Sequence, residues 1–374
     1  MGEGKEKEGK VKERKEKYKK VMDGETGREN RNRWKKLLPF ILAAGALVLL
    51  WFLWFSLDLY RQRQETEARI RERGNGEAIE VLGSAVENVL EYEGKKYRRN
   101  TAIRAILCIG VDTTGEMERY HVSGAAGQAD GIFLVAQDMA SDTVQILMIP
   151  RDTMTKITLF DYFGNELGKD VQHLTLAYAY GDGKEQSCEL MTEAVSDLLY
   201  GLRVDGYFAT NISTVEILND EIGGVEILVE DGSLSEKYPE FVKGEKVLLK
   251  GKQAEHYIRY RDINQYQTAL TRLERQKGYI KAYIETAKRR AEEDAQMIVR
   301  LMDDVEKYMI TNMAKDQYMD MGLAVLNSPQ IMDDGDFIFL PGEAARTELY
   351  EEFHPDEEKV KELVIRLFYK EVRS

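Results

Sequence analysis

The hydrophobic positions of this chain fall into one long run, in which Asp58 is the one charged residue, and a series of short runs with strand or helix spacing. The long run covers residues 37–59 and predicts one membrane-spanning helix, because about 20 uncharged residues suffice to cross the hydrocarbon core of a bilayer. Short apolar runs at 105–112, 131–138 and 143–149 predict strands. The polar residues 139–142 between the last two runs predict a hairpin turn.

Strand and helix patterns alternate along the rest of the chain. Apolar residues three and four apart predict helices over 184–199, 214–222, 251–259, 268–290 (with helical spacing continuing to about 313) and 357–368. Further strands are predicted over 206–212, 225–230 and 336–340. Because the two element types alternate in a mixed order, we expect an α/β fold. Its architecture would be a three-layer α-β-α sandwich around a mixed central sheet, preceded by one transmembrane helix.

Charge divides the chain into four predicted parts. Residues 1–36 hold 14 Lys and Arg against 8 Asp and Glu, which predicts a basic, disordered tail that stays in the cytoplasm. The span at 37–59 then places everything after it outside the cell membrane, and the protein crosses that membrane once. Residues 60–100 are expected to form a charged juxtamembrane stalk and a small hairpin. Residues 101–374 are expected to form one extracellular domain, with its core at about 101–295.

The net charge narrows the choice of partners. The whole chain has a formal net charge of −13 although its first 36 residues are basic, so the body is acidic and a poor surface for nucleic acid. The basic tail could be a nucleic-acid arm, but a disordered tail that touches anionic lipid is the interpretation that we favour. A signal peptide is the alternative for the apolar run, which is too long for one. Cys108 and Cys188 are expected to be free and buried.

Two carboxylates and a set of arginines are the main candidates for chemistry. Asp112 ends the first predicted strand of the body, and Asp130 directly precedes the next one. Arginines follow in the runs 149–153, 257–261 and 272–276. Mg²⁺ usually binds through one or two carboxylates together with phosphate oxygens of a substrate. The inventory therefore suits a divalent metal plus a polyanionic phosphate ligand.

Each candidate also has a purely structural interpretation. Asp112 could be a turn residue and Asp130 a strand cap. Arg151 could form a salt bridge with Asp152 or Asp130. His173 is expected to be a structural histidine with a satisfied ring. The other candidates could be solvated groups of a loop or of an exposed helix face: Arg259, Arg261, Arg272, Arg275 and Gln276.

The order of these motifs resembles the LytR-CpsA-Psr family, and the resemblance covers about residues 85–295. An apolar span is followed by Ile-Gly-Val-Asp at a strand end and by an aspartate directly before a hairpin. Then come Ile-Pro-Arg-Asp-Thr, Ala-Tyr-Ala-Tyr-Gly, Tyr-x-Arg-x-Arg and Arg-x-x-Arg-Gln. Each motif alone is weak, but together in this order on an anchored chain they are fairly specific.

The resemblance implies a phosphotransferase of the glycopolymer–peptidoglycan ligase type. It would move a glycopolymer from a polyprenyl-pyrophosphate carrier to a peptidoglycan acceptor at the membrane of a Gram-positive cell. Asp112 and Asp130 would bind Mg²⁺, and Arg151, Asp130 and Asp152 are the candidate catalytic residues. The pyrophosphate would be held by a set that the resemblance supplies: Arg151, Arg259, Arg261, Arg272 and Gln276, together with Gln128.

Several positions depart from the family pattern. Gln128 stands where the family often has an arginine, and Ala269 stands where it often has an aspartate. These departures favour an alternative function, which is a non-catalytic protein that binds lipid-linked polymer or organises wall assembly. The carrier lipid would need an apolar tunnel. Residues 133–135 and 146–148 of the predicted hairpin could line it, and an ordinary hydrophobic core is an equally good interpretation of these residues.

Overall fold

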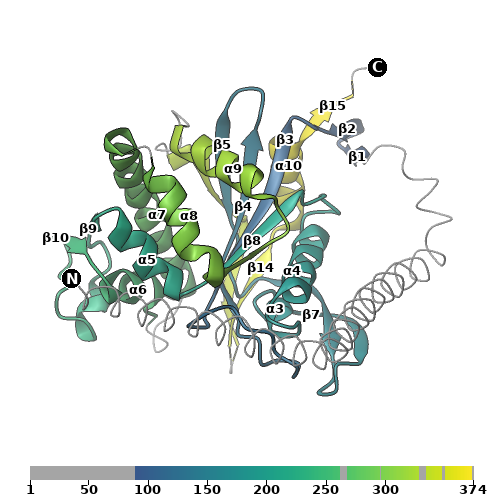
Figure 1. Ribbon diagram of the computed structural model, residues 1–374. Helices are drawn as coiled ribbons and strands as arrows, with labels where there is room; N and C mark the ends of the chain where they lie inside the picture. Colours follow the sequence, from purple (N-terminus) through teal and green to yellow (C-terminus); the bar gives the residue numbers. More distant parts are fainter. Residues whose placement is uncertain (1–88, 262–267, 295, 328–333, 348–349, 373–374) are drawn as a thin grey trace, which may run out of the picture. The chain divides into compact units, whose positions relative to one another are not determined.

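A mixed six-stranded sheet lies at the centre of the fold (Figure 1). The computed structural model describes residues 89–261, 268–294, 296–327, 334–347 and 350–372. The strands of the sheet, in spatial order, are β11 (Met309–Thr311), β8 (Gly206–Asn211), β3 (Ile103–Val111), β4 (Ala129–Asp138), β5 (Thr143–Met148) and β12 (Phe337–Phe339). Strand β3 is parallel to β8 and β5 is parallel to β12, while the other neighbours are antiparallel. The predicted α/β fold with a mixed central sheet is confirmed.

Helices cover both faces of this sheet, which gives three layers. One face packs against α3 (Leu176–Ala179), α4 (Glu185–Leu198) and α10 (Glu357–Phe368). The other face packs against α5 (Ser213–Glu221), α7 (Thr268–Glu293), α8 (Met297–Val305) and α9 (Lys315–Asn327). The period of two in β3 explains this division, because successive side chains of a strand point to opposite faces. Leu107 and Ile109 thus enter the first core cluster, and Ile106 enters the second.

Smaller sheets and one further helix surround this body. The predicted small hairpin is confirmed as β1 (Val89–Tyr92) and β2 (Lys95–Arg99), and β2 also pairs with the last strand, β15 (Tyr369–Glu371). The other two-stranded sheets are β6 (Met154–Phe160) with β7 (Glu166–His173), β9 (Val225–Leu228) with β10 (Lys246–Leu249), and β13 (Gly342–Arg346) with β14 (Glu351–Pro355). Helix α6 (Lys252–Arg259) precedes α7 in the chain.

Short one-turn segments connect some of these elements: η1 (Gly232–Glu236), η2 (Glu306–Tyr308) and η3 (Asp334–Asp336). The predicted helices at 184–199, 214–222, 251–259 and 357–368 agree with α4, α5, α6 and α10 within one or two residues. The prediction that helical spacing continues to about residue 313 was wrong in part. Helix α7 ends at Glu293 and α8 carries the helical pattern on to Val305, but the chain then forms η2 and the edge strand β11 before residue 313.

None of the helices in the described residues is long and apolar enough to cross a bilayer. The predicted span at 37–59, the tail at 1–36 and the stalk up to residue 88 lie outside the described residues. The predicted membrane topology, with one span and a cytoplasmic tail, therefore remains a prediction. The two cysteines, both described, are free as expected, and Cys188 is buried while Cys108 is only partly buried.

Candidate functional site

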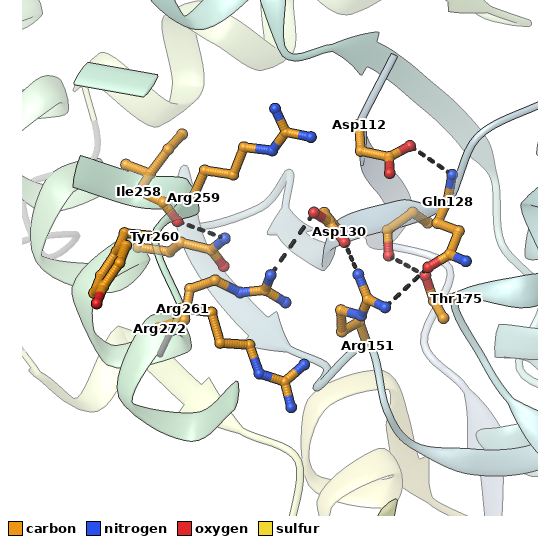
Figure 2. Close-up of polar contacts among 12 residues, drawn as sticks. Asp112, Gln128, Asp130, Arg151, Thr175, Ile258, Arg259, Tyr260, Arg261 and Arg272 are labelled. Atoms are coloured by element: carbon orange, nitrogen blue, oxygen red, sulfur yellow. Dashed lines mark hydrogen bonds and ion pairs between the residues drawn. The ribbon is translucent and has the colours of Figure 1, made fainter. Parts of the chain in front are cut away.

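Asp112 and Asp130 lie together where β3 ends and β4 begins (Figure 2). The two strands are antiparallel, so the end of one meets the start of the other, and a register shift lies between Gly110 and Val111. The Oδ1 atom of Asp112 accepts a hydrogen bond of 2.7 Å from the backbone N–H of Gln128, which closes the intervening loop. Both carboxylates line one cavity. The expected convergence of the two acids is therefore present.

Arg151 follows strand β5 and is bound by its neighbours on three sides. One Nη atom donates to Asp130, Nε donates to Asp152 Oδ1 at 3.1 Å, and the other Nη donates to Gln128 Oε1 at 2.9 Å. Burial opposes the charge of Arg151, but Asp130 and Asp152 together raise its pKa above the ordinary value. The structural interpretation of Arg151 as a partner of Asp130 and Asp152 is thus realised. Gln128 supports Arg151 here, where an arginine at position 128 would repel it.

Arg272 is almost fully buried, with 5% of its surface exposed, on the first turns of α7. Its Nη1 atom lies 3.7 Å from Asp130 Oδ2, so Asp130 stands between Arg151 and Arg272 (Figure 2). Burial lowers the pKa of Arg272 to about 10, Asp130 offsets part of this effect, and the nearby charges of Arg151 and Arg261 add to it. The charged form of Arg272 therefore lowers the stability of the folded protein.

Gln276 lies one turn after Arg272 in α7, and both side chains line the cavity that Asp112 and Asp130 share. Its Nε2 atom donates to the backbone oxygen of Ile258 at 3.4 Å, while its buried Oε1 atom has no hydrogen-bond partner within the described residues. Arg275 points elsewhere: it donates to Asp231 Oδ2 at 2.7 Å and to the backbone oxygen of Tyr260. Arg275 thus pairs with a carboxylate outside the cavity and does not join Arg272 and Gln276 in its wall.

Arg261 and Arg259 diverge where α6 ends (Figure 2). The Nη2 atom of Arg261 donates to Glu351 Oε2 at 2.6 Å, and its Nη1 atom lies 3.4 Å from Asp152 Oδ2. Arg259 also lines the cavity, but its side chain is 44% exposed and pairs with Glu255 one turn earlier. Helix α6 thus ends at Arg259 as predicted. The expectation that both arginines reach inward is only partly met, because Arg259 is 44% exposed and Arg261 is 20% exposed.

A mainly apolar cavity of about 290 Å³ adjoins this charged cluster. It lies between the second face of the sheet and helices α5, α6 and α7, and Asp112, Asp130, Arg272 and Gln276 contribute its polar wall. The remaining wall is largely hydrophobic: Ile109, Val111, Phe133, Phe208, Val215, Leu218, Ile258, Ile280, Tyr279 and Tyr283. Arg151, Arg261 and Asp152 are not among the described residues that line it.

The expected tunnel residues take other positions. Of the two segments 133–135 and 146–148, only Phe133 lines the cavity, while the others pack in the two core clusters on either side of the sheet. The cavity forms instead over Gly110 and Gly131, which face each other across β3 and β4. Two adjacent residues without side chains leave space that none of the described helices fills.

Glu351 and His173 lie at the edge of the site. Glu351 was not predicted, although a signal exists: it lies two residues before the buried Phe353, so in a strand both side chains share one face. His173 Nε2 donates a hydrogen bond of 3.0 Å to the backbone oxygen of Glu351, so His173 is a structural histidine as expected. Among the described residues, no group of three or more His, Cys, Asp or Glu side chains is arranged to hold a metal ion.

The arrangement combines a cluster of three arginines and three carboxylates with an apolar cavity beside it. The arginines are Arg151, Arg261 and Arg272, and the carboxylates are Asp130, Asp152 and Glu351. Such a site suits an amphiphile with an anionic head and an apolar body, because guanidinium groups bind phosphate oxygens and the cavity takes hydrocarbon.

The fold is similar to that of proteins whose structures have been solved. A structure described as TagT bound to LI-WTA superposes with a TM-score of 0.53 at 19% identity, over 71% of this chain and 90% of that one. A protein from Streptococcus agalactiae superposes with a TM-score of 0.56 at 20% identity, over 71% and 87% of the two chains. At such identities the likeness concerns the fold.

The chain belongs to the LytR_cpsA_psr family, because the sequence model of that family matches residues 63–366. Among curated relatives, it is 26% identical over 174 residues to the polyisoprenyl-teichoic acid–peptidoglycan teichoic acid transferase TagV of Bacillus subtilis. That match covers 45% of this chain and 41% of the relative. The chain spans about half the length of the first such relatives, with 41%, 44% and 53% of their lengths matched. The family membership expected from the motifs is confirmed.

Proposed function

We propose that this protein transfers a glycopolymer from a polyprenyl-pyrophosphate carrier to peptidoglycan. The observation that supports the proposal most directly is the position of Asp130, Arg272 and Gln276 in the polar wall of an otherwise apolar cavity. A prenyl chain would occupy the cavity, and its pyrophosphate would lie against these side chains. The names of the relatives, which specify transfer of teichoic acid to peptidoglycan, agree with this substrate class.

In the proposed reaction, a hydroxyl of the acceptor attacks the sugar-side phosphorus and loses its proton to water, and polyprenyl phosphate leaves with the bonding electrons. Arg272 would contact the phosphates directly, and Arg151 would stabilise charge through the Asp130 edge of the site. Arg259, which lines the cavity, and Arg261, which does not, would add positive charge around the same head group. Asp152 is buried between Arg151 and Arg261, so its role would be to hold both guanidiniums.

Asp112 and Asp130 would hold the magnesium ion. Their oxygen atoms are the donors that Mg²⁺ prefers, and both line the cavity. Because these are the only two acids among the described residues of the cavity wall, the remaining ligands would be phosphate oxygens and water. When bound, the ion would neutralise charge on the phosphates.

The substrates agree with the predicted topology. A single span at 37–59 with a cytoplasmic tail would place the domain outside the cell membrane, beside both the carrier lipid and the wall. In this proposal the membrane supplies the carrier, peptidoglycan is the acceptor, and nucleic acid has no role.

The test is transfer by the full-length protein in detergent. We would supply a polyprenyl-pyrophosphate-linked glycopolymer and peptidoglycan, with MgCl₂ or with EDTA. Transfer should require magnesium, and it should be lost in the double variant Asp112→Ala/Asp130→Ala. Asp304→Ala, a change of an exposed acid on α8, is the matched control and should retain full activity.

The same assay distinguishes the alternative function. A protein that binds prenyl pyrophosphate but never transfers polymer would be a binding or scaffold protein. A double variant that transfers at the wild-type rate would show that the two aspartates hold no essential metal.

A further inference from the structure

The C-terminal hairpin β13–β14 contributes a side chain to the charged cluster. Three contacts fix β14, two of them beside the residues that follow β5 and one beside the end of β7. The backbone N–H of Phe353 donates to Asp152 O at 2.8 Å, Phe353 forms an isolated parallel bridge with Thr153, and Glu351 O contacts His173 Nε2 at 3.0 Å. The buried Phe353 side chain anchors the strand in the core.

The alternation of β14 separates its two adjacent glutamates. Glu351 shares the inward face with Phe353, and its side chain is 11% exposed. Glu352 lies on the opposite face and pairs with His354 at 2.9 Å. Only Glu351 therefore reaches the cluster, where its Oε2 atom accepts from Arg261 Nη2 at 2.6 Å.

We propose that Glu351 is a positioning residue, which holds the Arg261 guanidinium ready for an anionic head group. Arg261 is bound on one edge by Glu351 and approached on the other by Asp152, so two carboxylates from distant segments define its orientation. A free arginine side chain must lose conformational freedom to bind a ligand, and an arginine that is already held loses less. This inference rests on the proposed function, because it assumes that the head group is a pyrophosphate.

A glutamate has two opposing effects here, and a pair of variants separates them. Its charge repels an anion, while its oxygen holds Arg261. Glu351→Gln and Glu351→Ala remove the same charge, but only the glutamine keeps an oxygen that can accept from Arg261. The difference between these two variants therefore measures positioning alone.

The experiment measures binding of farnesyl pyrophosphate to the full-length protein by titration calorimetry in the presence of MgCl₂. We expect Glu351→Ala to bind about tenfold more weakly than Glu351→Gln, because loss of about one oriented charge-assisted hydrogen bond corresponds to roughly that factor. The same pair of substitutions at Glu352 should show no difference. In an Arg261→Ala background, the difference between Glu351→Gln and Glu351→Ala should vanish.

That background distinguishes positioning from a general effect on the hairpin. Equal affinities of E351Q and E351A would overturn the inference, and so would a difference that persists without Arg261. If the wild-type protein does not bind farnesyl pyrophosphate at all, the proposed function fails and the inference fails with it. If the wild type binds and only the difference is missing, the proposed function stands and only the role of Glu351 is rejected.

Discussion

Arg151 and Arg272 flank the same carboxylate, yet the fold treats their charges in opposite ways. The pKa of Arg151 is raised, so its charge stabilises the folded protein at any pH below its ordinary pKa. That contribution disappears only as the pH rises through the raised value. The pKa of Arg272 is lowered to about 10, so its charge costs stability below that pH. The cost disappears as the pH rises from about 10 toward the ordinary value of 12.5.

Replacing each arginine by methionine should reveal this contrast. Arg272→Met should raise the free energy of unfolding at neutral pH by up to about 3 kcal/mol, since Asp130 keeps Arg151 as a partner. Arg151→Met should lower it, because Asp130 and Asp152 lose the side chain that joins them. Both should weaken binding of prenyl pyrophosphate. Urea unfolding of the two variants beside the wild type measures the signs, and equal destabilisation by both would contradict this contrast.

The charge of Arg272 also predicts a pH dependence of binding. Affinity for inorganic pyrophosphate should fall once the pH exceeds about 10, the value to which burial lowers the pKa of Arg272. The expected slope is about tenfold for each pH unit, as for the loss of one bound proton. In Arg272→Lys the fall should begin at lower pH, because burial lowers the pKa of an ordinary lysine from about 10.4. The same onset in both proteins would assign the titration to another group.

A third expectation at this scale concerns hydrogen-bond geometry. Arg151 donates from three different nitrogen atoms, to Asp152, Asp130 and Gln128. A lysine has a single nitrogen and cannot reproduce this arrangement. Arg151→Lys should therefore weaken binding of farnesyl pyrophosphate by about tenfold or more. Arg203→Lys, a change at a side chain that is 80% exposed, is the control and should leave affinity unchanged.

At the scale of elements, the pairing of β3 with β4 determines both parts of the site. It brings the two aspartates to one end of the strands, and it sets Gly110 opposite Gly131 under the cavity. A β-carbon at Gly110 would lie 3.6 Å from the Gly131 backbone, which is ordinary contact. A larger side chain at position 110 is thus compatible with the strand and would occupy the cavity.

Gly110→Val should therefore weaken binding of the lipid chain and leave binding of the head group unchanged. We expect the variant to fold, since valine suits a strand. It should lose most of its affinity for farnesyl pyrophosphate while binding inorganic pyrophosphate like the wild type. Gly278→Ala provides a matched control, because this glycine of α7 has open space around its missing β-carbon and does not line the cavity. Parallel loss of both ligands in Gly110→Val would show that the cavity is not the prenyl site.

At the scale of the whole molecule, the two ends of the described chain meet. Strand β2 pairs with β15, and α10 contributes Val364, Leu367 and Phe368 to the main core cluster. The last 60 residues are therefore part of the fold and, through Glu351, part of the charged cluster. A domain that ended at about residue 295 would lose the core contacts of α10 and the contact between Glu351 and the charged cluster.

The predicted topology can be tested on the intact protein. A reporter enzyme that is active only outside the cell membrane, fused after Ser374, should be active. The same reporter fused before residue 37 should be inactive, because the basic tail is expected to remain in the cytoplasm. An inactive C-terminal fusion that is expressed and accumulates in the cytoplasm would overturn the proposed location. The proposed substrates would then be out of reach.

The sequence alone determined the class of fold and the family. Periods of two and of about 3.6 depend only on local geometry, so the strands at β3, β4 and β5 and the helices α4 and α10 could be predicted within one or two residues. It also supplied five candidate site residues that lie in short motifs, which are Asp112, Asp130, Arg151, Arg272 and Gln276. Charged strands such as β7 could not be predicted in this way, since exposed residues carry no apolar period.

Only the tertiary structure decided which of these groups lie together. Arg275 has the spacing of the site but turns to Asp231, and Glu351 has no motif but reaches Arg261 across 90 residues of chain. The cavity likewise arises from two glycines on paired strands, and not from the hydrophobic hairpin that the sequence suggested. Such choices depend on which side chains meet across elements, and no pattern local to one segment contains that information.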